Sequence, residues 1–105
     1  MTNRKAQIEA LLEDDPSDVF LRYGLALEYE KEGRLQRALE ILEQLIAEDP
    51  PYVPAFHMSG QWHAQAGRLE AARDVLRRGI EAARNQGRQH DAAEMSDLLT
   101  TIGAG

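Results

Sequence analysis

The sequence predicts an all-α fold of about six helices, arranged as antiparallel helical hairpins that stack side by side. The phrase GRLQRALEIL at residues 33–42 returns 34 positions later, at residues 67–76, as GRLEAARDVL. In both copies the apolar residues follow the spacing of three and four that is typical of a helix with one buried face. Self-similarity at a period of about 20 to 50 residues indicates stacked units that cannot bury their apolar faces alone.

The same shift of 34 residues aligns the residues that separate the helices. Pro16 aligns with Pro50, each after an aspartate, and Gly33 aligns with Gly67. Proline removes a helix hydrogen-bond donor and disfavours helical geometry in the preceding residue, so each Asp-Pro pair is expected to separate two units. Gly33 and Gly67 are expected to adopt the left-handed conformation that a short turn between helices requires.

Residues 1–16 are predicted to form an N-terminal half-repeat with one helix over residues 3–14. This helix corresponds to the second helix of a hairpin whose first helix is missing. Its apolar residues are Ile8, Leu11 and Leu12, which align with Leu42, Leu45 and Ile46 of the predicted buried face in the next unit.

Residues 17–50 are predicted to form the first full repeat. Its first helix extends from Asp18, a suitable N-cap, to Glu32, and carries Leu21, Leu25 and Tyr29 on one face. Its second helix follows the glycine turn, with an apolar face comprising Leu35, Ala38, Leu39, Leu42, Leu45 and Ile46.

Residues 51–87 are predicted to form the second full repeat. Its second helix is expected to extend from Leu69 to Gln86, because Arg84 replaces the proline that ends the first repeat. Within it, Gly79 is expected to let a neighbouring backbone approach closely. The predicted stripe of this helix is Leu69, Ala72, Leu76 and Ile80.

Residues 88–105 are predicted to form a C-terminal capping helix and a frayed tail. The helix is expected over residues 89–101, and the tail reads TTIGAG. Its apolar residues, at helical spacing, are Ala92, Met95, Leu99 and Ile102.

Composition excludes several classes of partner. The net charge is −6, with acidic and basic residues interspersed, so no basic patch for nucleic acid is expected. No apolar stretch approaches the roughly 20 residues that a membrane helix needs. The chain has no cysteine, which excludes disulfides and thiolate metal sites. We therefore expect a cytoplasmic protein that binds neither nucleic acid nor membranes.

No catalytic, cofactor or metal site is predicted. His57 and His63 are six residues apart, on different faces of a helix, whereas a helical metal pair needs a spacing of three or four. His63 is instead expected to fill a buried aromatic position, and His90 to flank the last helix. The aspartates around Pro16 lack the glycine and the late glutamate of a calcium loop. Nucleophile elbows and glycine-rich phosphate loops are also missing, so we expect no enzyme activity.

The 34-residue pattern resembles the tetratricopeptide repeat family, whose signature is W-x2-L-G-x2-Y followed by alanine, a large apolar residue and proline. The first copy places at these positions Arg22, Leu25, Ala26, Tyr29, Ala38, Leu42 and Pro50. The second copy places there Phe56, Ser59, Gly60, His63, Ala72, Leu76 and Arg84. The small residues suit close helix packing. Arg22, Ser59 and His63 differ from the residues of the signature, and these differences are expected to affect how tightly the helices pack.

The resemblance implies a right-handed superhelix whose first helices line a concave groove that binds peptides or partner proteins, without catalysis. Carboxylate capture, for which the best-known groove of the family uses lysine and asparagine, is not expected, because Tyr23 and Leu27 occupy those two positions. The groove is expected to be more aromatic and apolar than charged. The groove residues are Phe20, Tyr23, Leu27 and Lys31 in the first repeat, and Pro54, His57, Met58, Gln61 and Gln65 in the second.

One stretch, from Pro50 to Gly67, contains no Asp, Glu, Lys or Arg in a chain that is 29% charged. Burial between neighbouring helices explains this for Phe56, Trp62 and His63. Depletion of charge and enrichment in aromatic residues and methionine also describe the centre of a protein-binding surface. We favour that second interpretation for His57, Met58 and Gln61, and also for Tyr23 in the first repeat.

Two functions remain open at this point. The first is a non-catalytic interaction module that binds a peptide or partner protein in its groove. The second is a structural protein that forms a homodimer or other homo-oligomer through its terminal helix or its charge-free second repeat. Repeat proteins commonly need three or more units for stability, and such association supplies the missing burial.

Overall fold

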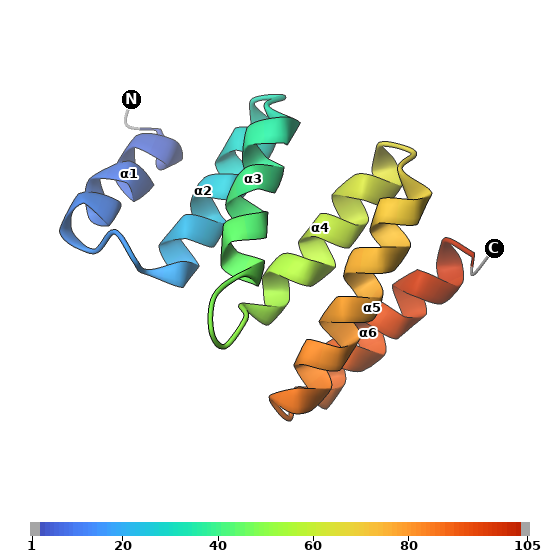
Figure 1. The fold of residues 1–105 in the computed structure, drawn as a ribbon. Helices are drawn as coiled ribbons and strands as arrows, with labels where there is room; N and C mark the ends of the chain where they lie inside the picture. The colour runs from blue at the N-terminus through green and yellow to red at the C-terminus, as the bar shows by residue number, and fades with distance from the viewer. Residues whose placement is uncertain (1–2, 104–105) are drawn as a thin grey trace. The chain divides into compact units, whose positions relative to one another are not determined.

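The computed structural model describes residues 3–103, and this part of the chain contains six helices and no strand (Figure 1). The prediction of an all-α fold of about six helices is therefore confirmed. The helices are α1 (Arg4–Asp14), α2 (Val19–Lys31), α3 (Leu35–Ile46), α4 (Val53–Gln65), α5 (Leu69–Asn85) and α6 (Gln89–Thr101). They form two compact units: the N-terminal unit holds α1 to α3, and the C-terminal unit holds α4 to α6.

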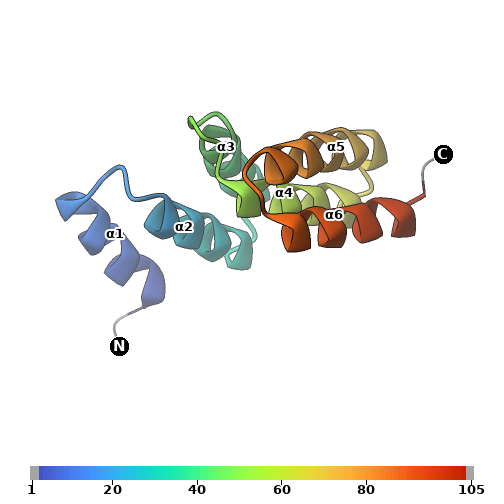
Figure 2. The same ribbon diagram turned by 90° about the horizontal axis from the view of Figure 1, so that it is seen from below.

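In the N-terminal unit, α2 and α3 form an antiparallel hairpin, and α1 lies against α2 (Figure 2). The Asp18 side chain caps α2, since its Oδ1 accepts a hydrogen bond from the Leu21 N–H at 2.8 Å. Gly33 has a φ of 79°, which confirms the left-handed turn, and Gly67 repeats this φ between α4 and α5. The capping residue Asp18 therefore marks the start of α2, and the two glycines mark the turns inside the hairpins.

The core of the N-terminal unit lies along α3. The predicted apolar face of this helix is buried from Ala38 onward, and Leu35 is half-buried. The buried apolar residues of the unit are Ile8, Ala26, Ala38, Leu39, Ile41, Leu42, Leu45 and Ile46.

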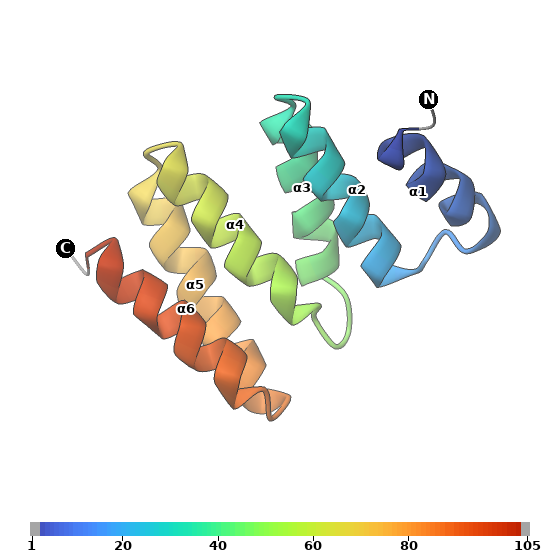
Figure 3. The ribbon, with the colours of Figure 1, turned by 180° about the vertical axis from the view of Figure 1, so that it is seen from behind.

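In the C-terminal unit, α4 and α5 form a hairpin, and α6 packs mainly on α5 and also reaches α4 (Figure 3). Two glycines set the spacing of these helices. A β-carbon on Gly60 of α4 would lie 2.5 Å from Cδ2 of Leu76 on α5. A β-carbon on Gly79 of α5 would lie 2.5 Å from Phe56 Cβ and 2.6 Å from Met95 Sδ. The atoms nearest to Gly79 belong to Phe56 and Met95, and Phe56 Cβ is bonded directly to the backbone of α4, so the neighbouring helix does come close at this glycine as expected.

The C-terminal end of α6 is tied to α5 by Arg73. Its Nη1 donates a hydrogen bond to the Gly103 carbonyl at 3.2 Å, and its Nη2 donates to Glu70 Oε1 at 2.6 Å. The Arg73 guanidinium therefore holds the pKa of Glu70 below its usual value. Helix α6 covers residues 89–101, as predicted, so the first two residues of the TTIGAG segment are helical and do not fray. Residues 104–105 of that tail lie outside the described residues.

Two apolar residues of the predicted buried stripes are exposed instead. Leu11, which aligns with the buried Leu45, is 54% exposed, because α1 packs on α2 and no described residue of the N-terminal unit covers its other side. Leu69 is 41% exposed at the first residue of α5. Helical periodicity thus located the apolar faces correctly, but at the ends of elements these faces are not fully covered.

We expect Gly79→Ala to lower the free energy of unfolding by up to about 2 kcal/mol, because overpacking against Phe56 and Met95 costs about 1–3 kcal/mol and alanine regains only ~1 kcal/mol in helix propensity. Urea unfolding followed by circular dichroism measures this change. Gly24→Ala is the matched control, because its β-carbon would meet only the flexible end of Ile8, at 3.3 Å from Cδ1. That variant is expected to gain up to about 1 kcal/mol. Equal stability of the two variants would contradict the close packing at Gly79.

Candidate protein-binding surface

The four predicted groove residues of the first repeat lie on one face of α2, because their spacings of three, four and four residues follow the helical turn. Phe20 is 70% exposed, Tyr23 and Leu27 are half-buried, and Lys31 is exposed. Lys31 Nζ pairs with Glu28 Oε2 at 3.2 Å, so its charge is partly neutralised on the same helix. We call this set the α2 face.

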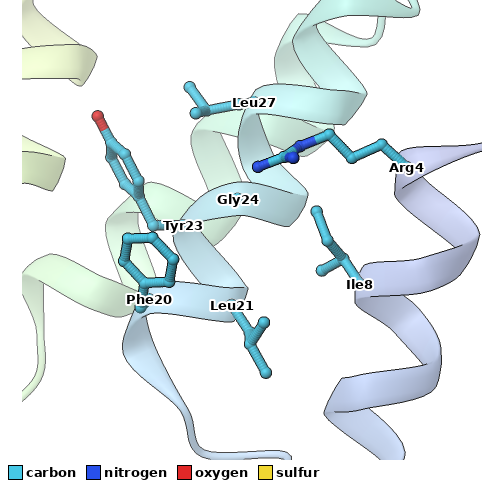
Figure 4. Close-up of a pocket in the computed structure, with 7 residues that line it drawn as sticks. All are labelled: Arg4, Ile8, Phe20, Leu21, Tyr23, Gly24 and Leu27. Atoms are coloured by element: carbon cyan, nitrogen blue, oxygen red, sulfur yellow. The ribbon is translucent and has the colours of Figure 1, made fainter.

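The α2 face continues into a pocket of about 120 Å³ between α2 and α1 (Figure 4). In the close-up, Phe20 and Tyr23 lie side by side at one edge of the pocket, and Ile8 of α1 and Leu21 of α2 both extend into the space between the two helices. The Arg4 side chain reaches from α1 toward α2, where its Nε lies 3.5 Å from Glu28 Oε2. The lining residues are Arg4, Ile8, Phe20, Leu21, Tyr23, Gly24 and Leu27.

The sequence did not point to four of these lining residues. Arg4 and Ile8 belong to the N-terminal half-repeat, for which the sequence predicts no site, and Leu21 is assigned there to a face of its helix with Leu25 and Tyr29. Gly24 lies against Ile8, since a β-carbon at Gly24 would be 3.3 Å from Ile8 Cδ1. One signal could have identified this pocket. Ile8 and Leu11 form an apolar face on a helix whose hairpin partner is missing, so part of that face has no helix to pack against.

The five predicted groove residues of the second repeat lie on one face of α4, and we call this set the α4 face. Pro54, His57, Met58 and Gln61 are half-buried, and Gln65 is exposed. Nε2 of Gln61 lies 3.5 Å from Nε2 of His57, so these two polar groups are positioned one turn apart. The α4 face therefore offers the polar groups of His57 and Gln61 beside the apolar side chain of Met58.

The charge-free stretch is divided between the two sides of α4. Phe56 and Trp62 are buried, as the burial interpretation expected, and Ser59 is also buried. His63, for which a buried position was expected, is half-buried. Burial thus explains one side of the helix, and the α4 face accounts for the other.

The described part of the chain holds no arrangement with evident metal chemistry. Among residues 3–103, no group of three or more histidine or acidic side chains is placed to hold a metal ion. His90 lies in the first turn of α6, with Nε2 at 3.6 Å from Glu94 Oε1. In the same residue range, no helix combines the length and apolar character needed to cross a membrane.

A cluster of basic residues surrounds the Tyr29 ring at the end of α2. Lys5 Nζ lies 4.7 Å from the ring centroid, and the guanidinium carbons of Arg34 and Arg37 lie at 4.8 and 5.7 Å. These cations come from α1, from the turn before α3 and from α3. Lys5 is also paired with Glu32 at 3.2 Å. We interpret the cluster as a contact that joins three helices.

Comparison with known proteins identifies similar folds and sequences. Residues 29–95 match a family model described as a tetratricopeptide repeat. A TPR repeat-containing protein of Pseudomonas aeruginosa is 29% identical over 95 residues, which cover 90% of each chain. The solution structure of a tetratricopeptide repeat domain protein from Salinibacter ruber is 37% identical, with a TM-score of 0.79, covering 85% of this chain and 90% of that one.

Two further solved structures are similar. A crystal structure of the tetratricopeptide repeat domain protein from Salinibacter ruber is 36% identical, with a TM-score of 0.73, covering 82% of this chain and 96% of that one. The crystal structure of MamA is 18% identical, with a TM-score of 0.59, covering 98% of this chain and 76% of that one. At that identity, the likeness to MamA concerns the fold alone.

We expect Tyr29→Leu to lower the free energy of unfolding by about 1–2 kcal/mol, because it removes cation–π contacts that contribute about 0.5–1 kcal/mol each at exposed sites. Tyr29→Phe keeps the ring and is expected to stay within about 0.5 kcal/mol of the parent. Thermal or urea unfolding measures both variants. If leucine and phenylalanine were equally tolerated, the ring would not be what holds these cations.

Proposed function

This chain belongs to the tetratricopeptide repeat family, and from that premise we propose that it binds segments of partner proteins, through the α2 face in its N-terminal unit and through the α4 face in its C-terminal unit. Proteins of this family generally mediate protein–protein interaction and are typically non-enzymatic scaffolds. The proposed contact residues of the α2 face are Phe20, Tyr23, Leu27 and Lys31, and those of the α4 face are Pro54, His57, Met58, Gln61 and Gln65.

The observation that carries the proposal is the exposure of Phe20. A phenylalanine that is 70% exposed, next to the rim of an apolar pocket, leaves a large apolar area in water. A single exposed apolar residue is common, but Phe20 continues into the half-buried Tyr23 and Leu27, and contiguous exposed apolar surface marks interaction sites. Tyr23 adds a second aromatic ring, a residue type that is enriched in the energetic centres of protein interfaces.

The α4 face supports the same function by its chemistry. It carries no charged side chain, since Pro50 to Gly67 contains none, and its histidine, methionine and glutamines are partly accessible. Charge depletion at the centre of an interface lowers the desolvation cost of binding. The two faces therefore suit a partner segment with apolar side chains and neutral polar groups more than one with a terminal carboxylate.

We expect Tyr23→Glu and His57→Glu each to weaken the capture of a partner protein at least about fivefold, because a buried carboxylate at a binding hot spot costs more than ~1 kcal/mol. The measurement is quantitative affinity capture from a lysate of the source organism, with the immobilised chain as bait. Circular dichroism must show unchanged helicity in both variants.

Gln44→Glu is the matched control, because Gln44 is exposed on α3 and belongs to neither face. It introduces the same charge and is expected to leave capture unchanged. If both face variants captured the same proteins as the parent, the proposed surface would be wrong. Light scattering distinguishes the alternative of homo-oligomeric assembly, which requires a stable oligomer at micromolar concentration.

A further inference from the structure

Few buried side chains hold helix α1 against α2. Of the residues of α1, Ile8 alone is buried, whereas the buried residues of α3, which packs on the same helix, run from Ala38 to Ile46. Among residues 3–103, α2 is the helix against which α1 packs. An isolated helix of this length is marginal in water, so α1 depends on its contacts with α2 in order to remain helical.

The polar contacts of α1 lie at its first turn. Arg4 Nε lies 3.5 Å from Glu28 Oε2, and Lys5 Nζ lies 3.2 Å from Glu32 Oε2. Lys5 Nζ also lies 4.7 Å from the centroid of the Tyr29 ring. Exposed ion pairs and cation–π contacts are each weak, and these contacts can therefore form and break without the loss of a large buried surface.

The other end of α1 is joined to α2 by a short turn that carries negative charge. Within this turn the Asp18 N–H donates a hydrogen bond to the Asp15 carbonyl at 3.2 Å. Glu13 and Asp14 precede the turn, so the charges at this end of α1 repel those of Asp15 and Asp18. The turn therefore connects the two helices, while attraction between charges acts at the opposite end of α1.

The pocket of Figure 4 lies between these two ends, with α1 as one of its walls. Ile8 of α1 lies against Gly24, and Leu21 extends into the same space. Both residues of α2 line the pocket together with Tyr23 and Leu27 of the α2 face. If α1 moves away, Leu21 and Gly24 become accessible beside Tyr23 and Leu27, and the apolar surface of α2 is enlarged.

We propose that α1 is a hinged lid on this pocket. It opens about the turn at residues 15–18 while α2 and α3 stay folded, and the contacts of Arg4 and Lys5 determine how often it opens. This inference goes beyond the proposed function, because it concerns α1 itself and holds whether or not a partner binds the α2 face. A ligand that binds the enlarged apolar surface stabilises the open state, in proportion to its preference for that state.

Hydrogen exchange of the full chain, resolved by residue, tests the lid. Relative to their rates in an unfolded chain, the amides of residues 8–14 are expected to exchange at least about tenfold faster than those of Leu42 and Leu45 in α3. Lys5→Gln removes an ion pair and a cation–π contact, and is expected to speed exchange in α1 about fivefold and to leave α3 unchanged. Glu32→Gln is expected to speed it about two- to fivefold.

Two controls accompany these variants. Asp74→Asn removes a carboxylate that pairs with Arg78 within α5, and is expected to leave exchange in α1 unchanged. The double variant of Lys5→Gln and Glu32→Gln is expected to exchange within about twofold of Lys5→Gln, because the same ion pair is lost once. Equal protection of α1 and α3 in the parent, or an equal rise in both after Lys5→Gln, would show that the unit opens as a whole and would overturn the inference.

A single introduced thiol provides an independent measurement, because the chain has no cysteine. Ile8→Cys places the thiol under the lid, and Leu42→Cys places it in the core of α3. The first is expected to react with a thiol reagent about tenfold or more faster than the second, and Lys5→Gln is expected to accelerate the first alone. Equal reaction rates at the two positions would contradict a lid that opens separately. The exchange experiment keeps Ile8, so it stands even where the cysteine weakens packing.

Discussion

Close approach of helices at small residues is the constraint on which the rest of this structure depends. Alanine or glycine at the centre of each hairpin lets the facing helix approach until large side chains fill the remaining space. Gly79 shows the geometry most clearly, since Phe56 and Met95 reach it from two different helices. Ala26, Ala38 and Ala72 are completely buried at the corresponding contacts. The exposed faces of α2 and α4 are held in place by this packing.

The fold could be predicted because local physics determines most of it. Gly33 and Gly67 adopt left-handed conformations, and Asp18 caps α2, for reasons that depend only on nearby residues. The apolar face of α3 likewise follows from its helical spacing. The 34-residue period then predicts that similar hairpins follow one another along the chain. The match to a tetratricopeptide repeat model agrees with this arrangement.

The candidate site could be predicted only in part, because periodicity identifies an apolar face but not what covers it. Leu11 and Leu45 occupy equivalent positions, yet Leu11 is 54% exposed and Leu45 is fully buried. The difference depends on whether a neighbouring helix is present, which no local pattern encodes. For the same reason the sequence predicts no site at Arg4 and Ile8, although they line a pocket together with Tyr23. Which residues share the α2 face, and which share the α4 face, could be predicted more easily, because each face lies on a single helix and follows its periodicity.

The outermost helices of the two units differ in a way that bears on function. Phe56, Gly60 and His63 on the packed side of α4 are replaced on α6, at the equivalent positions, by His90, Glu94 and Asp97, which are all exposed. That side of α6 is well solvated, and binding there would have to remove water from charged groups. The side that α1 and α2 share instead exposes Leu11 and leaves Leu27 half-buried, so covering it would bury apolar surface. This side borders Phe20 and Tyr23 of the α2 face, which line the same pocket as Leu27.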